Sequence, residues 1–181
     1  GILGRAYYDG KNSNRADNNT VTNPGLGIFS GELFLFEVET HETLYPNFLT
    51  RFAKRFIKTV PQMGGTPVGT DAIDPVILER DFDPNTANLQ QLRRYLDILY
   101  AADDWATATG VILAHEIGHS IGLVATGTPP QGLHGDNSLH NMRPNLGDIM
   151  SSAVSYDSVV SLNYHFRDIN IAYLRQRLLL K

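Results

Sequence analysis

The stretch LAHEIGHSIGLVATGTPPQGLH, residues 113–134, places two histidines four residues apart in a segment that we expect to be helical. Positions four apart lie on the same face of a helix, one turn above the other. His115 and His119 can therefore both reach a single ion. Glu116 is rotated by about 100° from His115, so it can hold a metal-bound water without being a ligand itself.

The helix that carries this pattern should begin near Asp103 or Asp104, since either residue can cap it, and should run to about Leu123. Gly122 can end it in a left-handed turn. On the face opposite the histidines, an apolar stripe at i, i+4 and i+8 is expected to anchor the helix to the core. The stripe consists of Leu113, Ile117 and Ile121.

Two histidines and a neighbouring glutamate in this order are typical of catalytic zinc sites. Such a site uses three protein ligands and keeps one position open. The ion lowers the pKa of its bound water towards 7, and Glu116 would take the proton from that water. The chain contains no cysteine, which excludes thiolate ligands and disulfides. We therefore predict one catalytic Zn²⁺ with a third ligand further along the chain.

HEIGHSIGL, residues 115–123, resembles the longer motif of the metzincin zinc peptidases, His-Glu-x-x-His-x-x-Gly-x-x-His (or Asp). GDIMSSAVSYD, around Met150, is similar to the Met-turn that lies beneath the metal in that clan. The resemblance is specific over about residues 105–156 and only general before them. At the third-ligand position of the motif this chain has Ala125.

The resemblance implies that residues 123–139 form an insertion ahead of the third ligand. Their Gly and Pro content favours a loop over further helix. His140 lies ten residues before Met150 and His134 lies sixteen before it. Loop length favours His140, with His134 and then Asp136 as alternatives.

Four further residues are considered for the site. Met150 is expected to be a packing residue and not a ligand. Tyr156 could stabilise the oxyanion of the reaction, point into the cleft, or pack against the final helix. His41 lies between a predicted strand and a predicted helix, where an exposed or capping histidine is usual. His165 lies beyond the Met-turn, where a structural role is commoner than ligation.

The resemblance also implies an α+β fold that forms a single metallopeptidase catalytic domain over residues 1–181. An upper subdomain, about residues 1–122, would contain a twisted mixed sheet with backing helices above the cleft. A lower, irregular subdomain, about residues 123–181, would contain the Met-turn and a C-terminal helix.

Hydropathy patterns locate the remaining elements. Alternation over residues 27–40 indicates a strand, and the spacing of phenylalanines over residues 45–60 indicates a helix. Another helix is expected over about residues 86–101, and a last one over residues 166–180. The side of the 86–101 helix expected to be buried consists of Leu89, Leu92, Leu96 and Leu99.

The net charge and hydropathy of the chain limit the classes of partner that it could bind. A net charge of −4 over 181 residues argues against nucleic acid, whose binding surfaces are usually basic. No apolar run reaches the length of a membrane span. We expect a monomer that acts on protein or peptide substrates. The chain opens with Gly1 and not Met, so we expect a processed or trimmed piece. Calcium is a secondary candidate cofactor, with the polar loop 9–25 as its candidate location.

The leading hypothesis is a secreted zinc metalloendopeptidase, a hydrolase. One alternative is a zinc peptidase whose third ligand is an aspartate, either Asp136 or Asp148. Another is a catalytically inactive, peptidase-like binding domain. Ala125 favours the inactive domain, whereas the presence of Glu116 opposes it.

Overall fold

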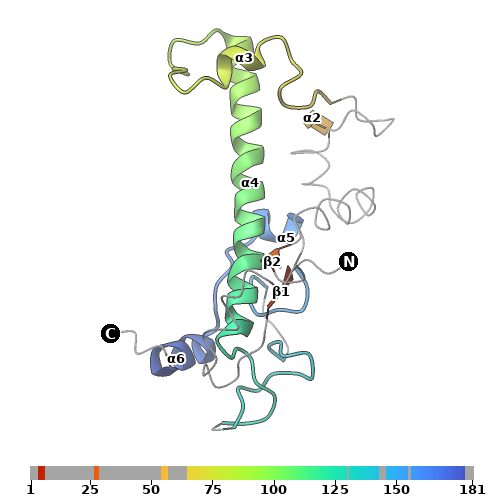
Figure 1. The fold of residues 1–181 in the computed structure, drawn as a ribbon, viewed down its shortest axis with the longest axis vertical. Coiled ribbons are helices and arrows are strands. Elements are labelled where there is room, and N and C mark those ends of the chain that lie inside the picture. The colour runs from red at the N-terminus through yellow and green to blue at the C-terminus, as the bar shows by residue number, and fades with distance from the viewer. Residues whose placement is uncertain are drawn as a thin grey trace.

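The computed structural model describes residues 4–6, 27–28, 54–56, 65–129, 131–142, 146–154 and 156–177. One long helix, α4 (Leu89–Ser120), forms the axis of the molecule (Figure 1). Short elements lie at its ends and along its second half. They are β1 (Gly4–Arg5), β2 (Gly27–Ile28), α2 (Lys54–Phe56), α3 (Asp74–Ile77), α5 (Tyr156–Ser161) and α6 (Asp168–Arg177).

Helix α4 begins at a capping box. Asn88 has extended backbone angles, and its side chain accepts the N–H groups of Gln90 and Gln91, both at 3.0 Å. The Gln91 side chain accepts the Asn88 N–H in return, at 3.1 Å. The prediction of two helices with a boundary near Asp103 or Asp104 was wrong. Both aspartates lie inside one continuous helix of 32 residues.

The end of α4 confirms the predicted left-handed turn. Gly122 has a φ of 94°, which favours glycine because a side chain would be strained there. The Leu123 N–H donates to the Gly118 carbonyl at 2.9 Å, and the Gly122 N–H donates to the His119 carbonyl at 3.1 Å. This pair of bonds is a Schellman motif, which satisfies the last carbonyls of the helix.

The buried face of α4 differs from the predicted one. Leu113 and Ile117 are 47% and 48% exposed, so the expected anchoring stripe was wrong. Leu89 and Leu99 of the other predicted stripe are exposed as well. The face of α4 that packs against the rest of the chain is rich in small side chains. These let α5 and the loop that follows α4 approach closely. The buried residues of this face are Ala101, Asp104, Ala108, Val111, Ile112 and Gly118.

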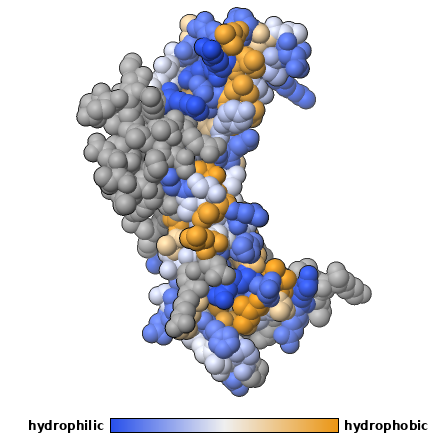
Figure 2. All heavy atoms as spheres, turned by 180° about the vertical axis from the view of Figure 1, so that it is seen from behind, coloured by the Kyte–Doolittle hydropathy of each residue, from blue (hydrophilic) through white to orange (hydrophobic). Residues whose placement is uncertain are grey.

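Hydrophobic residues are accordingly visible at the surface along the molecule in Figure 2. None of the helices in the described part of the chain combines the length and the apolar character that a membrane span requires.

The predicted twisted mixed sheet, and with it the metzincin-like α+β architecture, is contradicted by the described residues. These are mostly helical, and their only sheet is one antiparallel pair in which Gly4 faces Ile28 and Arg5 faces Gly27. The motif behind the expectation specifies a helix and its chemistry, whereas a sheet needs strand partners that the motif does not encode. Most of the predicted strand 27–40 and helix 45–60 lies outside the described residues.

The core at the C-terminal end of α4 joins the loop after Gly122 to the Met150 turn and α6. It consists of Leu123, Val124, Ile149, Met150 and Tyr173. The Tyr173 hydroxyl also donates to the Ile121 carbonyl at 3.2 Å, which ties α6 to the end of α4. Helix α6 confirms the predicted closing helix, although residues 178–180 lie outside the described part.

A buried ion pair secures the other end of α4. The Arg94 guanidinium donates to both carboxylate oxygens of Asp74, at 2.8 and 3.0 Å. The N–H groups of Gly69 and Asp71 also donate to that carboxylate, at 2.7 and 3.1 Å. The Arg94 hydrogen bond holds the pKa of Asp74 at about 2. The pair therefore fastens the 65–77 segment to the helix.

We expect Asp74→Asn to lower the free energy of unfolding by about 3 kcal/mol, because Arg94 would keep a largely buried charge without its partner. The pKa of Asp74 is lower in the folded chain, at about 2, than its ordinary 3.8. The stabilisation is therefore complete above pH ~4 and is lost as the pH falls towards 2. Urea unfolding at neutral and acidic pH measures both effects.

Asp97→Asn is the matched control. Its ion pair with Arg55 spans 3.3 Å, and both side chains are 38% exposed. Such a surface pair contributes less than about 1 kcal/mol. Equal losses in the two variants would contradict the structural role given to Asp74.

Candidate metal centre

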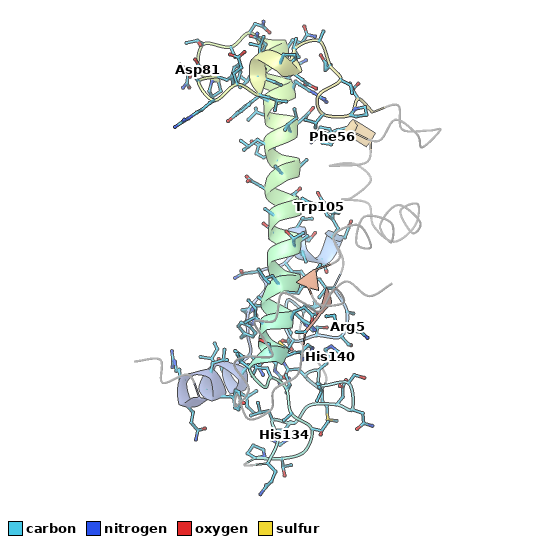
Figure 3. All side chains as sticks on the ribbon, in the orientation of Figure 1. Arg5, Phe56, Asp81, Trp105, His134 and His140 are labelled. Atoms are coloured by element: carbon cyan, nitrogen blue, oxygen red, sulfur yellow. The ribbon has the colours of Figure 1, made fainter. Side chains whose placement is uncertain are left out.

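Three histidines from two segments meet at the C-terminal end of α4. His115 and His119 come from the last two turns of the helix, and His140 comes from the loop that follows it. One ring nitrogen from each residue lies within 4.8 Å of the other two, so the group could bind a metal ion. Figure 3 shows His140 beside the helix end and His134 farther away. His134 is exposed and does not belong to the group.

Backbone carbonyls fix the orientation of the two helical imidazoles. His115 Nδ1 lies 2.6 Å from the Ile149 carbonyl oxygen, and His119 Nδ1 lies 2.9 Å from that of Leu123. A carbonyl oxygen only accepts, so each Nδ1 must carry the proton and donate it. The Nε2 atoms therefore hold the free lone pairs, and they face each other at 3.0 Å.

This arrangement fits a bound cation. Two lone pairs at that distance repel each other unless a positive charge draws them together. Donation of the outer N–H to a carbonyl is also the usual way in which a metal-binding histidine is oriented.

The protonation state of the group fits a cation as well. Burial lowers the pKa of His115 to about 4, with the Ile149 hydrogen bond opposing that effect. Burial also lowers the pKa of His119 and of His140. Neutral imidazole is the form that binds a metal, so protons compete little for this site near neutral pH.

The loop around Asp136 presents His140. The Asp136 carboxylate accepts the N–H groups of Ser138 and His140, at 2.8 and 2.9 Å. The Asp136 N–H donates to the His140 carbonyl at 2.8 Å. Asp136, one of the alternative ligands, thus shapes the loop. His140 Nδ1 is buried without a hydrogen-bond partner, and such atoms mark places where an ion or water completes the bonding.

Glu116 lies one position from His115, between α4 and β1. A Cβ atom added to Gly4 would come within 2.5 Å of Glu116 Oε1, so the strand packs directly against this carboxyl group. Burial raises the pKa of Glu116, and a hydrogen bond from the Ala6 N–H partly offsets that rise. The sequence motif identified Glu116, but nothing in it pointed to Gly4 or Ala6.

Met150 packs beneath the helix between the two ligand turns. It is fully buried, and a Cβ atom added to Gly118 would lie 2.5 Å from its sulfur. Gly118 is therefore small because the methionine occupies the space beside it. This placement agrees with the packing role expected of Met150.

The other candidates lie elsewhere. Tyr156 is fully buried and donates its hydroxyl to Asp104 at 3.0 Å. Asp104 is eleven residues before His115, or about 16 Å along the helix, so the structure gives Tyr156 a core role. His165 is exposed, and its ring pairs with the Asn163 carbonyl. His41 and the calcium candidate loop 9–25 lie outside the described residues.

The chain matches no protein-family model, no curated protein and no solved structure.

Each of the single substitutions His115→Ala, His119→Ala and His140→Ala should abolish tight binding of one divalent ion per chain. Each leaves only two of the three converging imidazoles. His134→Ala should leave the stoichiometry unchanged, since that side chain lies outside the group. Metal content after dialysis against zinc measures this. Loss of the ion in His134→Ala but not in His140→Ala would contradict the assignment.

Two glycines of α4 provide a matched pair. Gly118→Ala should destabilise the protein by about 1–3 kcal/mol, because the new methyl group collides with Met150. Gly110→Ala should stabilise it by about 0.5–1 kcal/mol, because nothing lies within 4 Å of the added Cβ and alanine favours helix. Thermal unfolding compares the two, and equal shifts would refute the packing of Met150 against Gly118.

Proposed function

We propose that this protein is a zinc-dependent endopeptidase in which His115, His119 and His140 hold the metal and Glu116 is the general base. The observation that supports it most strongly is the convergence of three imidazoles beside a half-buried glutamate. Imidazole nitrogens suit zinc among the common biological metals. Three protein ligands are typical of catalytic zinc sites, whereas structural sites use four.

In the proposed hydrolysis, the ion and Glu116 have separate roles. A zinc ion held by the three histidines would supply a water whose pKa is near 7 and would polarise the carbonyl of the peptide bond. Glu116 would accept one proton of that water as the water oxygen bonds to the carbonyl carbon, and would pass the proton to the amine nitrogen as the C–N bond breaks. Because burial raises the pKa of Glu116, its carboxylate is a stronger base towards that water.

The departure from the longer motif at Ala125 does not require an inactive protein. The Ala125 carbonyl accepts the N–H groups of Leu133 and Gly135, at 2.8 and 3.0 Å, and so organises the loop that leads to His140. Ala125 cannot provide the third ligand of the longer motif, and His140 provides it instead. A complete ligand set together with Glu116 favours an enzyme over a binding domain.

Glu116→Gln should reduce hydrolysis of casein by at least ~100-fold, because the amide cannot accept the proton of the attacking water. Zinc content should stay at the level of the unaltered protein, since Glu116 is not a ligand. A chelator should abolish cleavage, and added zinc should restore it. A fluorogenic casein assay measures these rates.

Glu79→Gln is the control, because Glu79 is exposed and lies in the segment before α4. It should retain full activity. Failure of the zinc-loaded, unaltered protein to cleave any peptide bond would favour the binding domain. Full activity of Glu116→Gln would remove Glu116 from the mechanism.

A further inference from the structure

A cluster of three buried polar side chains lies next to the segment that carries His140 of the candidate metal centre. Asn141, Asp148 and Asn170 are 3%, 1% and 0% exposed. They come from three separate segments, namely the loop after His140, the turn before Met150 and helix α6. We call them the Asn–Asp–Asn cluster.

Asn141 is the centre of this cluster. Its side-chain amide donates to both carboxylate oxygens of Asp148, at 3.0 and 2.9 Å, and to the side-chain oxygen of Asn170 at 2.9 Å. Asn170 donates back to the Asn141 side-chain oxygen at 3.4 Å. The Arg167 N–H also donates to Asn170, at 3.3 Å, which fixes that side chain at the start of α6.

The cluster is joined to the Met150 turn through the backbone. Asp148 accepts the Met150 N–H at 3.0 Å, and the Asn141 N–H donates to the Met150 carbonyl at 3.0 Å. These bonds lock the His140 segment and the 148–150 turn side by side.

Both locked segments serve the histidines directly. Asn141 follows His140 in the chain, and Asp148 precedes Ile149, whose carbonyl accepts the His115 Nδ1–H at 2.6 Å. We propose that the Asn–Asp–Asn cluster is the positioning device of the metal centre. It sets where His140 and the Ile149 carbonyl stand relative to α4, and thereby sets the affinity for the ion. This proposal rests on the metal site proposed above.

Simple core packing accounts poorly for the cluster. Burying polar groups is costly unless every partner is in place, and apolar side chains of similar volume would stabilise a core at least as well. The partners of Asp148 within the described residues are neutral, namely the Asn141 amide and the Met150 N–H. Fully paired polar networks do, however, fix a unique geometry, which a metal site needs.

The test compares Asp148→Asn and Asn170→Ala with the unaltered protein. Asp148→Asn places an amide N–H group opposite the Asn141 amide N–H, and Asn170→Ala removes the anchor on α6 without replacing any residue of the His140 loop. Zinc affinity is measured by competition with a chromophoric chelator, and ligand geometry by the visible absorption of the Co²⁺-loaded protein. We expect zinc binding 10- to 100-fold weaker in both variants, with an altered Co²⁺ spectrum.

The controls are Asp103→Asn and Asn163→Ala, two exposed positions, which should leave affinity and spectrum unchanged. A lower melting temperature of the metal-free variants with unchanged zinc affinity and Co²⁺ spectrum would mean a purely structural role and would overturn the proposal. If Asp148→Asn fails to fold, Asn170→Ala and the milder Asn170→Ser decide by the same readouts. Absence of zinc binding by the unaltered protein would refute the metal site and the proposed function together.

Discussion

The hydrogen bond from His115 Nδ1 to the Ile149 carbonyl, at 2.6 Å, joins the two halves of the site. It attaches the long helix to the turn that carries Met150. It also leaves the Nε2 lone pair of His115 pointing at that of His119. The packing of Met150 against Gly118 and the close approach of His140 both require the turn to lie against the helix at this point. A backbone carbonyl suits this task because its position is set by the fold and cannot change rotamer.

Helix α4 carries different interactions at its two ends. At its N-terminal end, the Asp74–Arg94 pair holds a loop on the helix and involves no group of the site. At its C-terminal end, the Gly122 turn releases the chain into the loop that brings His140 back to the helical histidines. A continuous helix keeps His115 and His119 rigidly one turn apart, and rigid elements hold metal ligands more accurately than loops do. The third ligand comes from a loop, which explains why so many hydrogen bonds are concentrated around Asp136 and Asn141.

Much of the site could be predicted from the sequence because it follows from helical geometry. The four-residue spacing of His115 and His119 places them together in any helix, and a glycine at 122 favours a left-handed end. Loop length alone favoured His140 over His134. The hydrogen bonds that orient His115 and His119 could not be predicted. Their acceptors are the backbone carbonyls of Leu123 and Ile149, and any residue at those positions would provide such a carbonyl.

The larger fold was harder to predict. Hydrophobic spacing indicated Leu113 and Ile117 as the buried stripe of α4, but packing uses the face of Ala101, Ala108 and Gly118, where small side chains allow close contact. The aspartates at 103 and 104 look like helix caps in isolation, yet the helix runs through them from the Asn88 capping box. The sheet was inferred from a local motif that does not encode strand pairing.

The most direct test of the account is diffraction from a zinc-soaked crystal, recorded on both sides of the zinc absorption edge. The account predicts one anomalous peak about 2.0–2.1 Å from a ring nitrogen of each of His115, His119 and His140. A peak bound by His134 or Asp136 in place of His140, or no peak at the histidine group, would contradict it.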